Sequence, residues 1–255
     1  MRLEGKKALV TGGGVGIGQA TALELARQGA DVFLSYYSDQ EGAEEAVDEI
    51  KAMGRQAYAM EADLGEVEDC FKLVDAAVEQ MGGIDILINN AGRTDEAPFD
   101  EVTPDEYDEL FAINMRGQFF VAQRAVRSMR ERGGGAIVNM SSVQGLMGTP
   151  DHSVYQGTKG AIISWTRAIA VELGQDRIRV NAVAPGLIEV ERHHEQSDYS
   201  PEEKSSRIPL RDVGHPPDVA YTCAWLVSDE AMYVTGAVIV VDGGVTAQLS
   251  LEACG

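Results

Sequence analysis

The chain has 255 residues and a net charge of −20, from 21 basic and 41 acidic side chains. Because nucleic-acid binding relies on Lys and Arg contacts to phosphate, this balance argues against a nucleic-acid partner. Apolar residues make up 44% of the chain, yet no apolar run approaches the roughly 20 residues that span a bilayer, so no membrane partner is expected. Three scattered cysteines and an N-terminus without a secretory pattern predict a cytoplasmic protein with no metal site.

Short apolar runs alternate with longer helical patterns along the chain. Strands are expected at Lys7–Thr11, Asp31–Tyr36, Gln56–Glu61, Ile84–Asn89, Ala136–Ser141, Ile178–Ala184 and Val238–Val241. Helices are expected at Gly16–Gln28, Gln40–Met53, Glu66–Met81, Pro104–Arg132, His152–Gly174 and Pro216–Ser228. Several strands are apolar almost throughout, which is typical of a parallel sheet covered on both faces.

This alternation predicts an α/β fold: a doubly wound, Rossmann-like, seven-stranded, mostly parallel sheet with helices on both faces. No repeat or linker divides the sequence, so residues 1–255 are expected to form a single dinucleotide-binding and catalytic domain. The stretch Glu189–Arg207 is long, polar and weakly patterned. Such a stretch in a compact domain predicts a substrate lid, placed here at about residues 187–210.

A glycine-rich turn joins the first strand to the first helix. Its sequence from Thr11 is T-G-G-G-V-G-I-G. Glycines let the backbone approach a pyrophosphate, and the N-terminus of the following helix offers free N–H groups. The residues expected to contact the dinucleotide here are Gly12, Gly14, Val15, Gly16, Ile17 and Gly18.

The second strand leads into Tyr36 and Tyr37, which are expected beside the adenosine ribose. Many dinucleotide folds have a carboxylate at this strand end, where it binds the ribose hydroxyls. None stands there in this chain, so a 2′-phosphate would not be repelled; no arginine stands there to attract it either. The cofactor is therefore NADP or NAD, with a slight preference for NADP.

At this point the sequence resembles the compact, single-domain branch of the short-chain dehydrogenase/reductase family, over nearly its whole length. The family motifs occur in order: T-G-x-x-x-G-x-G at Thr11–Gly18, N-N-A-G at Asn89–Gly92, N-x-x-G at Asn114–Gly117, a serine at Ser142, Y-x-x-x-K at Tyr155–Lys159, and P-G at Pro185–Gly186. The resemblance implies a homotetramer formed through the two long helices that hold Asn114 and Tyr155. It also implies further cofactor contacts by Asp63, Leu64, Asn90, Ala91, Gly92, Tyr155, Lys159, Pro185, Gly186 and Ile188.

Tyr155 is the expected general acid/base of a hydride-transfer reaction between NAD(P) and a secondary alcohol or carbonyl compound. A free phenol has a pKa of about 10, and a nearby cation lowers it. Lys159 lies four residues later and shares a helix face with Tyr155. Ser142 is expected to donate to the substrate oxygen, and the resemblance implies that Asn114 holds a water that relays protons from Lys159.

Substrate contacts are expected at Ser142, Gln144, Tyr155 and His193. The family often has threonine five residues after the proline of P-G, but this chain has Val190. Either another group makes the contact of that threonine, or the lid backbone follows a different path. Within the family, the chain resembles glucose 1-dehydrogenase and 3-oxoacyl-[acyl-carrier-protein] reductase. We expect a sugar or polyol substrate, with a 3-oxoacyl thioester as the alternative. A non-catalytic NAD(P)-binding sensor is the alternative of another class, although such proteins commonly lose the tyrosine or the lysine.

Overall fold

A computed structural model describes residues 1–190 and 200–248. Within them, a single seven-stranded sheet has the order β3-β2-β1-β4-β5-β6-β7, and every neighbouring pair is parallel. The predicted doubly wound sheet is therefore confirmed, with all of its strands parallel rather than most. The strands are β1 (Lys7–Val10), β2 (Asp31–Tyr36), β3 (Ala57–Glu61), β4 (Ile86–Asn89), β5 (Gly135–Met140), β6 (Ile178–Pro185) and β7 (Val238–Val241).

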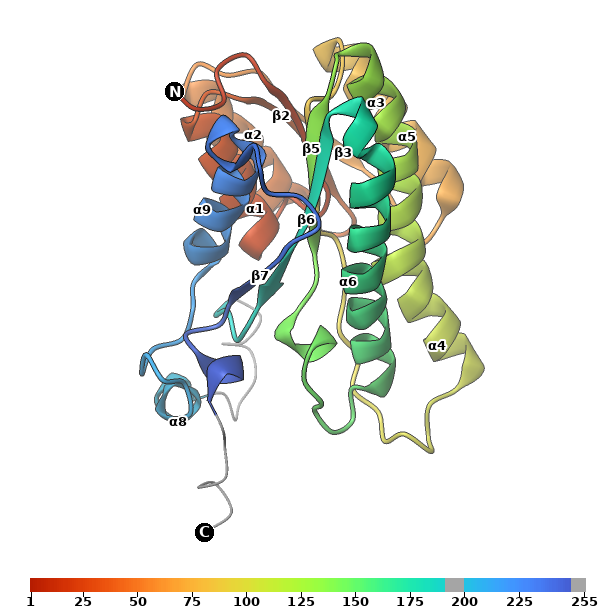
Figure 1. Ribbon diagram of the computed structural model, residues 1–255, viewed down its shortest axis with the longest axis vertical. Helices are drawn as coiled ribbons and strands as arrows, with labels where there is room; N and C mark the ends of the chain where they lie inside the picture. The colour runs from red at the N-terminus through yellow and green to blue at the C-terminus, as the bar shows by residue number, and fades with distance from the viewer. Residues whose placement is uncertain (191–199, 249–255) are drawn as a thin grey trace.

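Helices cover both faces of the sheet (Figure 1). On one face lie α1 (Gly16–Arg27), α2 (Gln40–Ala52) and α9 (Pro216–Val227); on the other lie α3 (Val67–Met81), α4 (Pro104–Phe111), α5 (Gln118–Glu131) and α6 (Ser153–Leu173). Shorter helical elements are η1 (Ala112–Gly117), η2 (Val143–Gly145), η3 (Gly174–Asp176), α8 (Pro201–Ser206), η4 (Asp229–Ala231) and η5 (Val245–Ala247).

The core has two parts, one on each face of the sheet. The first packs the apolar sides of α1, α2 and α9 against residues such as Val10, Val32 and Val138. The second packs α3, α5 and α6 against Leu9 and Leu87. Successive strand residues point to opposite faces, so apolar runs such as Ala8–Val10 supply both parts of the core.

Two sequence predictions are corrected at the level of single elements. The stretch 104–132 is not one regular helix: a π-helical segment, η1, separates α4 from α5. The predicted lid range is not all irregular either, because α8 begins after Ser200, whose side chain accepts a hydrogen bond from the Glu203 N–H. Ser200 followed by Pro201 and then Glu203 is a helix-start pattern that could have revealed α8.

The direction of winding reverses between β1 and β4. From β1 the chain proceeds outward to β2 and β3, and then it returns to β4 and proceeds the other way to β7. In open α/β sheets, ligands bind in the crevice beyond the carboxyl ends of the strands at such a reversal. The ends of β1 and β4 are therefore where a site is expected.

Candidate active site

Thr11 and Asn90 join the ends of β1 and β4 at the winding reversal. The Thr11 hydroxyl accepts hydrogen bonds from the N–H groups of Asn90 and Ala91, each 3.0 Å long. The Asn90 side chain in turn donates to the carbonyl oxygens of Thr11 and Gly12, at 3.1 and 3.0 Å. These bonds fix the first turn of the glycine-rich segment against the neighbouring strand.

The glycine turn can exist only without side chains at two of its positions. Gly12 has a φ of +62°, in the left-handed region that favours glycine. A Cβ added at Gly18 would lie 1.9 Å from the Gly12 carbonyl oxygen, well inside contact distance. The turn is thus closed on itself, and it leads directly into the N-terminus of α1, whose first N–H groups have no partner within the helix. This arrangement fits a pyrophosphate.

We expect Gly18→Ala to weaken nucleotide binding strongly, because the added methyl group must push the turn open. The dissociation constant for NADPH, measured by fluorescence titration, should rise at least about a hundredfold. Gly174→Ala is the matched control, since a Cβ there meets nothing within 4 Å and φ is −59°. Unchanged NADPH affinity in Gly18→Ala would contradict this reading of the turn.

The other predicted cofactor residues lie along the same edge of the sheet. Asp63 and Leu64 follow β3, where the Asp63 carboxylate accepts a hydrogen bond of 2.8 Å from the Gly65 N–H and Leu64 is buried. Pro185 ends β6, and a Cβ on Gly186 would lie 2.7 Å from the Asp242 Cβ. Ile188 forms an isolated parallel bridge with Gly214.

Val190, where the family often has threonine, lies over the glycine turn. Its Cγ1 atom would be 3.3 Å from a Cβ on Gly16. The predicted substrate contact His193 falls outside the described residues, as does the middle of the predicted lid.

Tyr36 and Tyr37 end the second strand as predicted, and they differ in exposure. Tyr36 is half-buried against the core, whereas the side chain of Tyr37 is 67% exposed. The nearest following carboxylate, Asp39, caps α2 by accepting a hydrogen bond of 2.9 Å from the Gly42 N–H. The strand end itself therefore carries no acidic group.

Lys159 and Tyr155 are adjacent on α6. The Lys159 ammonium lies 5.5 Å from the centre of the Tyr155 ring and donates a hydrogen bond of 3.0 Å to the Met140 carbonyl oxygen. Lys159 is buried, and no acidic side chain in the described parts of the chain lies within ion-pair distance of it. Burial lowers the pKa of the Lys159 ammonium to about 8. A buried cation without a carboxylate is costly, and such groups gather at functional sites.

Ser142 lies at the end of β5, facing the same edge. It is buried and is the N-cap residue of η2, where its hydroxyl accepts a hydrogen bond of 3.1 Å from the Gln144 N–H. The serine oxygen is thereby held in place and keeps its own proton for donation. Gln144 is only half-buried, so it stands at the rim rather than inside the site.

Asn114 lies in the π-helical segment, and both polar atoms of its side chain are hydrogen-bonded within the protein. Its oxygen accepts a hydrogen bond of 2.9 Å from the Arg93 N–H, and its amide donates to the Arg93 carbonyl at 2.9 Å and to the Thr158 hydroxyl at 3.2 Å. π segments are frequent at functional sites. The segment after β4 is therefore fixed to α6 through Asn114.

Two neighbours of this site were not predicted. The Thr158 hydroxyl donates to the Tyr155 carbonyl at 2.7 Å and accepts from Asn114, which ties the two predicted catalytic helices together. His152 stands at the N-terminal end of α6, and its ring centre is 6.4 Å from that of Tyr155. Spacing of one helical turn before Tyr155 was the available signal for His152.

The described residues contain no group of three or more side chains that could hold a metal ion. None of their helices is long and apolar enough to cross a membrane.

Comparison with known proteins places these features in a family. A family model described as "Enoyl-(Acyl carrier protein) reductase" matches residues 13–246. A versicolorin reductase from Emericella nidulans is 44% identical, over 95% of this chain and 96% of that protein. A protein named "Probable tetrahydroxynaphthalene reductase", from Zymoseptoria tritici, is 42% identical over 95% of each chain.

Solved structures agree with the sequence relatives. Acetoin dehydrogenase from Enterobacter cloacae superposes with a TM-score of 0.90 at 37% identity, covering 96% of this chain and 97% of that one. A short-chain dehydrogenase from Burkholderia cenocepacia in complex with NADP has a TM-score of 0.90 at 36% identity, covering 96% and 100%. A 7α-hydroxysteroid dehydrogenase complexed with NADH has a TM-score of 0.91 at 33% identity, covering 95% of each chain.

Proposed function

The chain belongs to the short-chain dehydrogenase/reductase family, and on that premise we propose that Tyr155 is the general acid/base of its reaction. The family assignment makes it a nicotinamide-dependent oxidoreductase. The observation that carries the proposal is the buried ammonium of Lys159, which lies 5.5 Å from the Tyr155 ring with no carboxylate partner among the described residues. An ammonium in this position stabilises the phenolate form of the tyrosine.

The residues of the site divide the proton chemistry between them. When bound, the nicotinamide supplies or accepts the hydride. In reduction of a ketone, the Tyr155 hydroxyl gives its proton to the substrate oxygen while the Ser142 hydroxyl donates a hydrogen bond to that oxygen. In oxidation of an alcohol, the Tyr155 phenolate takes the proton back. Lys159 stabilises that phenolate and offers its remaining N–H groups to a ribose hydroxyl of the cofactor.

In this proposal the side chain of Asn114 acts as a positioning group, and the relay water expected from the sequence is kept at this residue. Its side chain is bonded to Arg93 and Thr158. The relay water is therefore assigned to its backbone carbonyl, since π-helical segments are frequent at functional sites. The side chain instead keeps the segment after β4 against α6, beside Lys159.

We assign the cofactor as NADP in preference to NAD, with residues 12–18 at the pyrophosphate. The end of β2 carries Tyr36 and Tyr37 and no carboxylate, so it does not repel a 2′-phosphate. A solved relative binds NADP and another binds NADH. Cofactor preference therefore has to come from this strand end rather than from family membership.

We expect Tyr36→Asp to change the preference toward NADH, because a carboxylate at the strand end accepts ribose hydroxyls and repels a 2′-phosphate. The ratio of kcat/KM for NADPH to that for NADH should fall about ten- to a hundredfold. Tyr36→Phe controls for the loss of the tyrosine. An equal NADPH-to-NADH ratio of kcat/KM in Tyr36→Asp and Tyr36→Phe would refute the assignment of NADP.

The substrate is a ketone or secondary alcohol that carries further hydroxyl groups. The sugar or polyol expected from the sequence is one such class. A hydroxylated aromatic ketone is the other, and a specific observation favours it: relatives named as versicolorin and tetrahydroxynaphthalene reductases are 40–44% identical. Leu146 and Met147 follow η2 beyond Ser142, and their side chains are about half exposed. They therefore offer an apolar surface on which the flat ring of an aromatic substrate can pack.

A spectrophotometric screen at 340 nm tests the proposal, with both cofactors and with sugars, polyols, acetoin, tetralones, 3-oxoacyl thioesters and enoyl thioesters. Oxidation or reduction at a C–OH centre is expected. Turnover of enoyl thioesters alone would overturn the assigned chemistry. Cofactor binding without turnover of any of these compounds would favour the sensor alternative.

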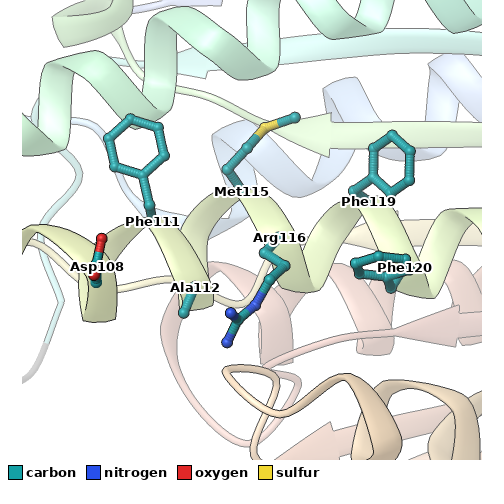
Figure 2. A pocket seen from close by; sticks show the side chains of 7 residues that line it. All are labelled: Asp108, Phe111, Ala112, Met115, Arg116, Phe119 and Phe120. Atoms are coloured by element: carbon teal, nitrogen blue, oxygen red, sulfur yellow. The ribbon is translucent and has the colours of Figure 1, made fainter.

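We propose a homotetramer built partly on the α4–η1–α5 helix. A hollow of about 450 Å³ on this helix is lined by Phe111, Met115 and Phe119 among others. Figure 2 shows these three side chains on one side of the helix and Arg116 on another. On a second face, Tyr233 is fully exposed and Val240 of the edge strand β7 is partly so. Light scattering is expected to give a tetramer mass; a monomer at micromolar concentration would contradict it.

The proposal also covers the domain organisation, the lid and the location of the protein. Residues 1–255 act as a single catalytic domain, with the lid at about 187–210 closing over the substrate. The segment around Leu187 and Glu189 is anchored to Gly214 by backbone hydrogen bonds of 3.1 and 2.7 Å, which is one end of such a lid. The cytoplasm is the proposed location.

A further inference from the structure

His152 stands beside the reacting tyrosine without a role in the proton chemistry above. It is the N-cap residue of α6, three positions before Tyr155. The two rings meet edge to face, with centres 6.4 Å apart and planes at 69°. Its side chain is only 14% exposed, so the imidazole lies within the protein wall beside the Tyr155 ring and is not a solvent-exposed surface group.

One nitrogen of the His152 ring is fixed by the protein. Nδ1 lies 2.7 Å from the Pro150 carbonyl oxygen. A carbonyl oxygen can only accept, so Nδ1 must carry the hydrogen. In the neutral imidazole this leaves Nε2 as an acceptor with a defined direction, and no ordering is required before a ligand binds.

Nε2 faces the junction between two loops that flank the site. The loop before α6 is tied to the segment after β4 by a backbone bond of 2.8 Å from Ala97 to Asp151. Across this junction, a Glu96 carboxylate oxygen lies 3.4 Å from Nε2, but the Glu96 side chain is 71% exposed. Neutral Nε2 and a carboxylate oxygen are both acceptors and do not hydrogen-bond each other, so a substrate hydroxyl can displace the exposed Glu96 side chain from this position.

We propose that His152 is a substrate-recognition residue, whose Nε2 accepts a hydrogen bond from a hydroxyl group carried by the substrate near its reacting carbonyl. The inference rests on the proposed function, because it places that carbonyl at Tyr155 and Ser142. It gives the proposed site a means of preferring hydroxylated ketones. A bare ketone has no hydroxyl group to donate to Nε2 and gains nothing from the histidine.

The test compares ketones that differ by one hydroxyl group next to the carbonyl: acetoin with 2-butanone, and 2-hydroxy-1-tetralone with 1-tetralone. The wild type is expected to prefer the hydroxylated member of at least one pair. His152→Phe keeps an aromatic ring against Tyr155 but has no Nε2. Its preference, measured as the ratio of kcat/KM for the hydroxylated ketone to that for the bare ketone, should fall about five- to tenfold, the size of one neutral hydrogen bond.

Two further variants separate recognition from structure. His152→Asn keeps a donor for Pro150 but cannot reach as far as Nε2, so it should lose the same preference. Glu96→Ala removes the competing carboxylate and should keep or increase the preference. An unchanged preference in both His152 variants, or its collapse in Glu96→Ala, overturns the inference. No reduction of any ketone by the wild type overturns the proposed function itself, and this inference with it.

Discussion

Tyr155→Phe is expected to bind its nicotinamide cofactor normally and to lose turnover by about 10²- to 10⁴-fold, the usual contribution of a positioned acid/base. The substitution removes only the hydroxyl that exchanges a proton with the substrate. The ring remains, and with it the contacts to the Lys159 ammonium at 5.5 Å and to the His152 ring at 6.4 Å. Cofactor affinity and folding should therefore be retained.

The measurements are kcat with the best substrate of the screen, and cofactor affinity from fluorescence titration. Tyr107→Phe is the matched control, since Tyr107 is a partly exposed tyrosine of α4 that stacks on Phe111 with ring centres 4.6 Å apart. Tyr107→Phe also loses a phenolic hydroxyl, but one that lies outside the site, so this variant should keep full activity. Activity of Tyr155→Phe within about threefold of that control would refute the assigned role.

The fold could be predicted from the sequence because its strongest signals are local. A buried parallel strand must be apolar on both faces, so runs such as Val32–Leu34 and Ile86–Ile88 stand out without any knowledge of their neighbours. The glycine turn is equally local, since it is set by φ angles and by close contact between Gly12 and Gly18. Both were predicted within one or two residues.

The details that the sequence did not reveal depend on contacts between distant segments. The π segment at Asn114 accompanies hydrogen bonds to Arg93, 21 positions earlier, and to Thr158, 44 positions later. The place of His152 depends on the backbone bond from Ala97 to Asp151. No periodicity in α5 or α6 encodes such partners, because a helical pattern records only which face is buried.

The same distinction between local and distant contacts applies to the proposed catalytic residues. Four-residue spacing predicted that Tyr155 and Lys159 share a face, and the structure places them together. Spacing could not predict that Lys159 is buried without a carboxylate partner among the described residues, which depends on β5, η2 and the segment around Gly92. That burial is what makes Lys159 unusual, and it has a consequence for stability as well as for catalysis.

Lys159→Met is expected to lower activity and raise stability together. Activity should fall at least about a hundredfold, because the phenolate of Tyr155 loses its neighbouring cation. Cofactor affinity should weaken about tenfold through loss of a ribose contact. The lowered pKa of about 8, against 10.5 for a free lysine, corresponds to about 3 kcal/mol of destabilisation of the charged form. Loss of the Met140 hydrogen bond offsets about 1 kcal/mol, leaving a gain of about 2 kcal/mol near pH 7.

The pH dependence of this gain identifies its cause. Between about pH 8 and 10.5 the unfolded wild type holds the Lys159 proton and the folded state does not, so wild-type stability rises across that interval. The variant has no such group, and its advantage should shrink over the same interval and vanish above it. Denaturant unfolding without cofactor, at pH 7 and at pH 10, measures this change. Lys6→Met, at an exposed lysine, is the control and should show neither effect. A gain that is absent at pH 7, or equally large at both pH values, would show that the burial of the charge is not what limits stability here.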